Sequence, residues 1–334
     1  MLSRLARSLQ TGVKMPFKVL VTHYDVPERG LEILRQNGCE LIINEEKPSA
    51  SYDEIKKKIP GVDAVFLVTK HKVDAALIAA AGPQLKVLGT MSAGFNHIDV
   101  AELKRRKVLV SNTPDVVSAP TANCAILLAL AAGRRMLEAR EQIFKENWTY
   151  GPQWLLGYDL TGSTIGIVGF GGIGQAIAKR LKSFDIKELL YSGPREKPEA
   201  AALDAKFASL DDLVSKSDFV FIAAPLTEKT KYMFNKTLFA KMKRTSILVN
   251  IARGELVNQD DLIEALQTKQ IFAAGLDVMY PEPLPKDHML LKLPNCVVIP
   301  HIGTATYAAR TSMAELCANN IIEGLKGKPL LTPL

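Results

Sequence analysis

Residues 164–174 read TIGIVGFGGIG, and this stretch decides the fold. Its first five residues form an apolar run typical of a buried strand, and apolar residues at helical spacing follow the glycines. A glycine-rich turn between a strand and a helix lets the backbone approach a pyrophosphate, whose negative charge the helix N-terminus favours. The stretch therefore predicts a dinucleotide-binding loop, with a purely structural glycine turn as the alternative. The expected loop residues are Gly169, Gly171, Gly172, Ile173 and Gly174.

An alternating series of strands and helices surrounds this loop. A long apolar helix at 123–132 leads into the series, which continues with helices at 173–184 and 260–266. The expected strands lie at 164–168, 189–191, 219–223, 247–250, 273–277 and 297–299. This order predicts a Rossmann-type α/β domain with a parallel, doubly wound sheet over residues 118–301.

A second series of short apolar runs and helical patterns fills the N-terminal third of the chain, from residues 19–21 to 87–88. It predicts another parallel-sheet domain, Rossmann-like or flavodoxin-like. A helical pattern at about 305–325 comes too late to join the other sheet, so we expect it to return to this domain. The expected substrate domain is therefore discontinuous, residues 18–117 plus 302–334, with the active site in the cleft between the two domains.

The composition favours a soluble protein of two domains. A chain of 334 residues with 47% hydrophobic content can bury two cores, and no apolar run reaches the roughly 18 residues that cross a bilayer. The net charge is +7, but the basic runs at 56–58 and 104–107 lack interleaved aromatic residues. No nucleic-acid or membrane partner is expected. The four cysteines form no C-x-x-C pair, which predicts reduced core residues and no metal site.

Residues 1–17 form a separate segment with no acidic residue before Asp25. Their apolar residues fall on one helical stripe, while Arg4, Arg7 and Lys14 fall on the opposite side. This pattern predicts a mitochondrial targeting segment, with a disordered tail as the alternative. A start at Met15 would give a cytoplasmic form.

The choice of cofactor depends on the end of the strand that follows the glycine loop. An acidic residue there would bind the adenosine ribose and repel a 2′-phosphate, but this sequence has Ser192. Arg195 and Lys197 follow, so NADPH is favoured and NADH remains possible. The alternative is that both cations are solvated loop charges, and Glu196 reduces the local positive potential.

Four ionisable side chains follow the ends of the last strands of the series around the glycine loop: Arg253, Asp277, Glu282 and His301. Ligands of open α/β sheets bind beyond the carboxyl ends of the strands, so these side chains are expected to converge. Reduction of a 2-oxo acid needs a cation for the carboxylate, a hydride donor and a proton donor. Each residue alone also has a structural interpretation, as an ion pair or a polar loop residue, but together they predict this chemistry.

The sequence resembles the D-isomer-specific 2-hydroxyacid dehydrogenase family from Lys18 to about Gly327. The glycine loop carries part of the likeness, together with residues 91–99 (MSAGFNHID), 250–257, 273–278, 281–284 (PEPL) and 300–304 (PHIGT). The resemblance implies NAD(P)H-dependent reduction of small 2-oxo acids by hydride transfer, such as hydroxypyruvate to D-glycerate and glyoxylate to glycolate.

The resemblance also implies roles for individual residues. His301 would donate the proton, and Glu282 would pair with it and favour its protonated form. Arg253 would grip the substrate carboxylate and keto oxygen, and backbone N–H groups around Ala93 and Gly94 would hold the carboxylate. Asp277 would contact the nicotinamide end of the cofactor, and further cofactor contacts are expected at Pro225, Ile251 and Gly303.

Two alternatives remain at this point. One is a non-enzymatic dinucleotide sensor, because the C-terminal binding proteins, a corepressor branch, have similar motifs. The other is a D-2-hydroxyacid dehydrogenase with another substrate, such as D-lactate. The family implies a homodimer through residues 137–156. In one departure from the family pattern, Thr121-Ala122 is followed by Asn123 where an acid is frequent, which puts one interdomain contact in doubt.

Overall fold

The computed structural model describes residues 16–68 and 71–334, so most of the expected targeting segment lies outside the described residues. The chain divides into a first unit, which runs to Val116 and resumes at Thr306–Leu334, and a second unit, Val117–Ala305. The sequence-based boundary placed residues 302–305 with the first unit. The structure places them with the second, because Asp277 of that unit accepts hydrogen bonds from the N–H groups of Ile302 and Gly303.

The first unit contains a five-stranded sheet in which all pairings are parallel. Its order is β2-β1-β3-β4-β5, the flavodoxin-like arrangement. Val65 at the centre pairs with Leu20 on one side and Leu88 on the other. The strands are β1 (Lys18–Val21), β2 (Glu40–Ile43), β3 (Ala64–Leu67), β4 (Val87–Thr90) and β5 (Leu109–Ser111).

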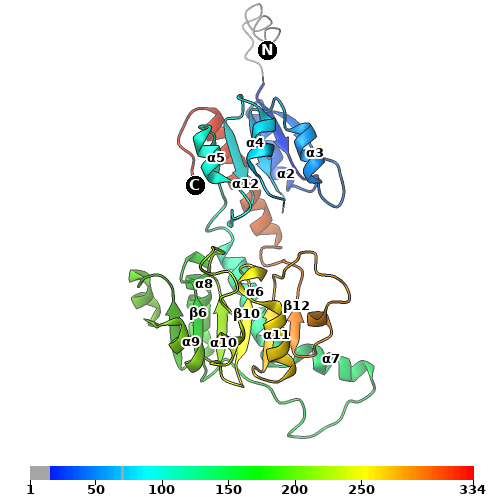
Figure 1. Ribbon diagram of the computed structural model, residues 1–334, viewed down its shortest axis with the longest axis vertical. Coiled ribbons are helices and arrows are strands. Elements are labelled where there is room, and N and C mark those ends of the chain that lie inside the picture. The colour runs from blue at the N-terminus through cyan, green and yellow to red at the C-terminus, as the bar shows by residue number, and fades with distance from the viewer. Residues whose placement is uncertain (1–15, 69–70) are drawn as a thin grey trace, which may run out of the picture. The chain divides into compact units, whose positions relative to one another are not determined.

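The helices of the first unit are α2 (Glu28–Gln36), α3 (Tyr52–Lys58), α4 (Ala75–Ala81), α5 (Val100–Arg105) and α12 (Tyr307–Leu325). The C-terminal helix α12 returns to this unit and packs closely against α2 (Figure 1). A Cβ atom added to Gly30 of α2 would lie 2.9 Å from the Ala314 carbonyl oxygen of α12. This glycine therefore allows the two helices to approach, and the first unit is built from both ends of the described chain.

The second unit contains a seven-stranded sheet, also entirely parallel, with the order β12-β11-β10-β9-β6-β7-β8. This is the dinucleotide-binding order with one additional strand, and its direction of winding changes between β6 and β9. The strands are β6 (Thr164–Val168), β7 (Glu188–Ser192), β8 (Ala205–Phe207), β9 (Phe219–Ile222), β10 (Ile247–Asn250), β11 (Ala273–Leu276) and β12 (Cys296–Val298).

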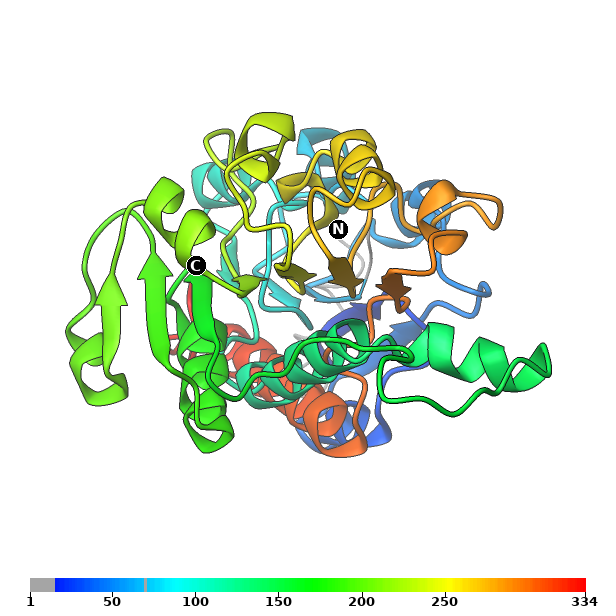
Figure 2. The same ribbon diagram turned by 90° about the horizontal axis from the view of Figure 1, so that it is seen from below.

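The α-helices of the second unit are α6 (Ser118–Gly133), α7 (Met136–Phe144), α8 (Gly172–Leu181), α9 (Leu210–Lys216), α10 (Lys236–Phe239) and α11 (Gln259–Gln267). The short 3-10 turns are η1 (Lys182–Phe184), η2 (Pro198–Leu203), η3 (Gly254–Leu256) and η4 (Met289–Leu291). Helix α6 packs on the sheet where Gly275 leaves room for Leu128. In contrast, α7 has no buried residue and projects from the sheet of its unit (Figure 2).

Two doubly wound parallel-sheet α/β units confirm the predicted fold class. Six short elements were not expected from the sequence: β5, β8, α5, α7, α9 and α10. The helix expected at 173–184 is shorter than predicted, since α8 ends at Leu181 and continues as the turn η1. All four cysteines are unpaired, and three are buried, as expected. Within the described residues, no helix has the length and hydropathy of a membrane span, and no cluster of possible metal ligands occurs.

Candidate active site

His301 lies three residues beyond the end of β12, in a loop with an unusual backbone. Its φ is 55°, in the left-handed region that residues other than glycine rarely adopt. The His301 N–H donates to the Asp277 carbonyl oxygen at 2.8 Å, which helps to hold this conformation. Strain of this kind persists where the surrounding structure enforces it, and it is frequent at functional sites.

The imidazole of His301 pairs with Glu282. The distance from His301 Nδ1 to Glu282 Oε2 is 2.8 Å, and the other carboxylate oxygen accepts a hydrogen bond from the Met279 N–H at 3.1 Å. The His301 side chain is 40% exposed and that of Glu282 15% exposed, so the ring is open to a ligand while its partner is held in place. Because Nδ1 faces the carboxylate, Nε2 is the ring nitrogen left to exchange a proton with a substrate.

Asp277 follows β11 and supports the same loop. Its two carboxylate oxygens accept hydrogen bonds from the N–H groups of Ile302 at 2.6 Å and Gly303 at 2.8 Å. Burial raises the pKa of the Asp277 carboxyl above its ordinary value, and the two N–H donors oppose that shift. In this structure Asp277 therefore fixes the loop that carries His301, which is a role the sequence did not indicate.

Arg253 follows β10 and lies in a partly buried loop that a buried asparagine holds. Asn250 Nδ2 donates to the Arg253 carbonyl oxygen at 2.9 Å, and Asn250 Oδ1 accepts from the Ala252 N–H at 3.1 Å. Burial lowers the pKa of the Arg253 guanidinium, while the charges of Glu282 and Glu255 oppose the shift. Arginine stays protonated in proteins, so a cation lies close to the carboxylate of the His301–Glu282 pair.

The loops that carry Arg253 and Glu282 are packed backbone to backbone. A Cβ atom added to Gly254 would lie 2.1 Å from the Met279 carbonyl carbon, so only glycine fits there. The Gln259 side chain also accepts from the Tyr280 N–H at 2.8 Å. The structure therefore brings Arg253, Glu282, His301 and Asp277 together at one edge of the sheet, as the strand-end argument predicted.

The glycine loop has the geometry of a dinucleotide cradle. Gly169 has a φ of 94°, and a Cβ atom at Gly174 would lie 2.2 Å from the Gly169 carbonyl oxygen, so both positions exclude side chains. A Cβ atom at Gly171 would meet no atom within 4 Å, which leaves open space at the N-terminus of α8. The first turn of α8 has no acidic residue, so its free N–H groups fit a pyrophosphate.

The remaining expected cofactor residues lie at the carboxyl ends of strands in the same sheet. Ser192 ends β7 and is buried, while Arg195 is exposed. Pro225 follows β9 and is exposed, and the buried Ile251 follows β10. Gly303 is held against Asp277, where a Cβ atom would lie 2.8 Å from Oδ2.

Ala93 and Gly94 belong to the first unit and follow β4. The Ala93 carbonyl oxygen accepts a hydrogen bond from Asn112 Nδ2 at 2.7 Å, and the Gly94 carbonyl oxygen accepts from Ser92 Oγ at 2.8 Å. Sequence reasoning missed both Asn112 and Asn250. Each is a buried amide at a strand end, since Asn250 is the last residue of β10 and Asn112 directly follows β5, and this position is the signal that could have identified them.

Comparison with known proteins decides the family. The family model "D-isomer specific 2-hydroxyacid dehydrogenase, NAD binding domain" matches residues 126–303, more than half of the chain. The chain belongs to the D-isomer-specific 2-hydroxyacid dehydrogenase family. The resemblance inferred from the sequence is thereby confirmed.

Relatives within this dehydrogenase family are similar over nearly their whole length. The glyoxylate reductase/hydroxypyruvate reductase of Homo sapiens is 44% identical over 319 residues, which cover 95% of this chain and 97% of that protein. The glyoxylate reductase of Thermococcus kodakarensis is 43% identical over 93% of this chain and 94% of its own length.

A solved structure shares the dehydrogenase fold. The NADPH-dependent glyoxylate/hydroxypyruvate reductase of Sinorhizobium meliloti, in complex with NADP and malonate, is 27% identical and superposes with a TM-score of 0.82. The match covers 96% of this chain and 97% of that chain.

The departure from the family pattern at Asn123 has a local explanation. Asn123 Oδ1 accepts a hydrogen bond from Arg180 Nε at 2.6 Å, which joins α6 to α8 within the second unit. An uncharged acceptor is sufficient for this contact.

Proposed function

We propose that the protein is an NADPH-dependent reductase of small 2-oxo acids, with hydroxypyruvate and glyoxylate as substrates. The observation that carries the proposal is the His301–Glu282 pair at 2.8 Å, beside Arg253, in a dehydrogenase that is 44% identical to a glyoxylate reductase/hydroxypyruvate reductase. Neither the dinucleotide-sensor alternative nor a different 2-hydroxyacid substrate is favoured by these relatives.

Arg253 and His301 divide the work of reduction. The planar guanidinium of Arg253 binds the substrate carboxylate and polarises the keto oxygen, with two donors in one plane. His301 Nε2 donates a proton to that oxygen as it gains negative charge, and the imidazole is left neutral. Glu282 holds the ring through Nδ1, so that Nε2 is the nitrogen presented to the substrate. Reduction to the 2-hydroxy acid would need a hydride at the keto carbon, which is the chemistry that a nicotinamide dinucleotide would supply when bound.

The preference for NADPH is supported by the end of β7. Ser192 stands where an acid would repel a 2′-phosphate, and the exposed Arg195 and partly exposed Lys197 follow within five residues. The Lys197 N–H donates to the Tyr191 hydroxyl at 2.9 Å, which ties this loop to the strand. The Sinorhizobium meliloti relative holds NADP.

We also propose a homodimer formed through residues 137–156. This stretch exposes apolar side chains, including Phe144 at 68% and Trp148 at 70%, and α7 has no buried residue. Exposed apolar patches of this kind mark interaction sites. Sedimentation of the wild type and of Phe144→Ser/Trp148→Ser tests the proposal, since the double variant is expected to sediment as a monomer.

Nicotinamide absorbance tests the reductase proposal directly. NADPH and NADH oxidation would be recorded with hydroxypyruvate, glyoxylate and pyruvate for the wild type, His301→Ala and His288→Ala. His288 caps the turn η4 and serves as the matched histidine control. We expect turnover with NADPH and hydroxypyruvate or glyoxylate, a loss of about 10³-fold in kcat for His301→Ala, and little change for His288→Ala. If the wild type binds cofactor but reduces no 2-oxo acid, the proposal is overturned.

A further inference from the structure

The loop after β4 exposes backbone N–H groups to a ligand. Among the described residues, none accepts a hydrogen bond from the N–H of Ala93 or Gly94. Both residues are partly exposed, and the segment 92–95 contains no charged side chain. An anion held here would therefore bind to backbone dipoles, whose strength depends on the direction in which they point.

The direction of the Gly94 N–H is set by a side chain that directly follows the neighbouring strand β5. A peptide bond is planar and trans, so the Ala93 carbonyl and the Gly94 N–H point in opposite directions. Asn112 Nδ2 donates to that carbonyl at 2.7 Å. This bond turns the Gly94 N–H away from Asn112, and rotation of the peptide would leave a buried amide donor unpaired.

The next peptide is fixed in the same way. Ser92 Oγ donates to the Gly94 carbonyl oxygen at 2.8 Å and lies 3.0 Å from Thr90 Oγ1. Two successive carbonyl oxygens are thus each bound by a side chain. In each peptide the N–H, that of Gly94 or of Phe95, points away from the side chain that binds its carbonyl.

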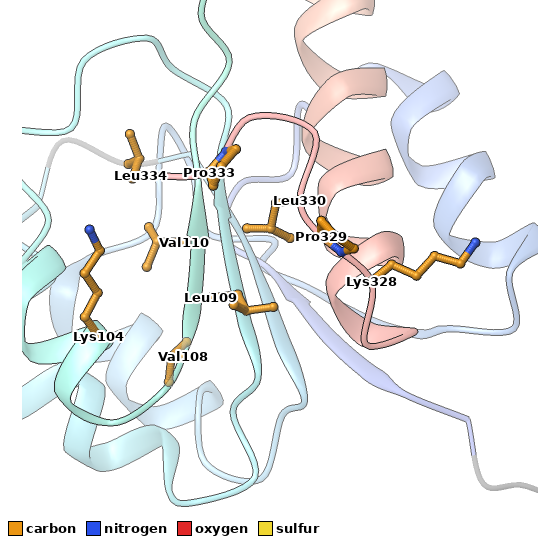
Figure 3. Close-up of a pocket in the computed structure, with 9 residues that line it drawn as sticks. All are labelled: Lys104, Val108, Leu109, Val110, Lys328, Pro329, Leu330, Pro333 and Leu334. Atoms are coloured by element: carbon orange, nitrogen blue, oxygen red, sulfur yellow. The ribbon is translucent and has the colours of Figure 1, made fainter.

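Asn112 is itself held by the C-terminal segment. Thr332 Oγ1 donates to the Asn112 carbonyl oxygen at 2.6 Å, and Thr332 is bound in turn by the buried Asn320 of α12. Figure 3 shows Pro333 and Leu334 beside Val110 of β5, where the Leu334 N–H donates to the Val110 carbonyl oxygen at 2.9 Å. The backbone of the residue that orients the loop is therefore held by partly buried hydrogen bonds to the C-terminal segment.

We propose that Asn112 is a positioning residue for the substrate carboxylate: it orients the Ala93–Gly94 peptide so that the Gly94 N–H is preset to donate to that anion. This inference rests on the proposed reduction of 2-oxo acids and adds a residue to it. Asn112 touches neither substrate nor cofactor. Its loss therefore weakens binding of the carboxylate and leaves the hydride and proton transfers intact.

The test compares two Asn112 variants with a matched control in the same unit. Asn112→Ala removes the donor, and Asn112→Asp replaces it with an isosteric group that does not donate when ionised. Asn37→Ala removes an asparagine whose side chain caps α2 on the surface. We expect Asn112→Ala to raise KM for hydroxypyruvate about tenfold with kcat nearly unchanged, and Asn112→Asp to raise it further. Asn37→Ala should match the wild type, and the Kd for cofactor should be equal in all four proteins.

The outcomes separate this inference from the proposed function. An unchanged KM in a folded Asn112→Ala overturns the inference, and so does a loss of cofactor affinity equal to the loss of substrate affinity. If Asn112→Ala does not fold, Asn112→Asp and Thr332→Val provide the test, and each is expected to raise KM for hydroxypyruvate while kcat stays nearly unchanged. If the wild type reduces no 2-oxo acid, the proposed function fails. Calorimetric binding of oxamate, a 2-oxo acid analogue that is not reduced, to the cofactor-loaded wild type and Asn112→Ala then decides the inference alone.

Discussion

The two units carry different chemical groups in the loops that follow their strands. In the second unit, charged side chains follow β10, β11 and β12, namely Arg253, Asp277 and His301. In the first unit, the loop after β4 contributes backbone N–H groups and has no charged side chain between Ser92 and Phe95. Each unit nevertheless holds its loop with one buried asparagine, Asn250 or Asn112. The two units therefore differ in the groups that they expose, charged side chains in one and backbone N–H groups in the other. In both, the amide of a buried asparagine fixes the backbone of the loop.

The largest effect is expected where the second unit depends on the shape of one side chain. Arg253→Lys keeps the charge but removes the planar pair of donors, so kcat/KM for hydroxypyruvate should fall by about 10²–10³-fold. Arg244→Lys, on a surface loop, is the matched control and should leave the kinetics unchanged. Near-native turnover of Arg253→Lys would show that charge alone is needed and would contradict the dependence of the second unit on the shape of this side chain.

Two glycines of the glycine loop are expected to respond differently to the addition of a Cβ atom, one through the stability of the fold and the other through cofactor binding. Gly174→Ala places a Cβ atom 2.2 Å from the Gly169 carbonyl oxygen and should destabilise the fold by about 3 kcal/mol. Gly171→Ala enters open space, so it should unfold at the wild-type temperature but bind NADPH more weakly. Thermal unfolding and cofactor titration of both variants distinguish the cases. Equal losses of stability would contradict the assignment of Gly171 to a ligand-facing position.

Asn250 tests whether the second unit uses its asparagine as the first unit uses Asn112. Asn250→Ala removes the acceptor of the Ala252 N–H and one of two donors to the Arg253 carbonyl oxygen, which keeps the Leu256 N–H, at a cost of about 2 kcal/mol. Because the role proposed for Arg253 is to bind the keto oxygen as well as the carboxylate, kcat should fall together with a rise in KM. Chemical denaturation and steady-state kinetics measure both. A change in KM alone would mean that both asparagines serve only the carboxylate.

The smallest effect is expected from a charge of the first unit that lies outside its site. Arg105 and Arg106 lower the pKa of Glu102 from its ordinary value to about 2. A lowered folded-state pKa stabilises the protein above the ordinary carboxyl pKa, and this contribution disappears as the pH falls through about 2. Glu102→Gln should therefore lower the unfolding temperature slightly near neutral pH and match the wild type in strong acid. Kinetic constants should not change, and any change would assign a functional charge to the first unit.

The position of the charged residues at one edge of the sheet could be predicted from the sequence for a physical reason. Parallel strands end at one edge of a sheet, so ionisable residues after successive strands are brought together by topology alone. This argument placed Arg253, Asp277, Glu282 and His301 correctly at one edge of the sheet. It did not show that Asp277 binds the N–H groups of Ile302 and Gly303, because the bend at His301 depends on a backbone angle that no residue pattern specifies.

The remaining features depend on contacts that a pattern does not encode. Asn112 and Asn250 appear in the sequence as ordinary polar residues after strands, and which carbonyl each binds is decided by the packing of distant segments. Strands β5 and β8 have three residues each, too few for a period of two to be recognised. The helices α9 and α10 span only seven and four residues, so their apolar faces are equally incomplete.

The return of α12 to the first unit has a consequence for the order of folding. During synthesis the second unit is complete in sequence once Ala305 has emerged from the ribosome, whereas the first unit still lacks the helix that packs on α2. The unit that begins first in the chain is thus the last to acquire its full core. The apolar faces of α2 and β4 stay uncovered until α12 has been synthesised, more than 200 residues later. A nascent chain stalled after Ala305 should therefore protect the second unit from protease before the first.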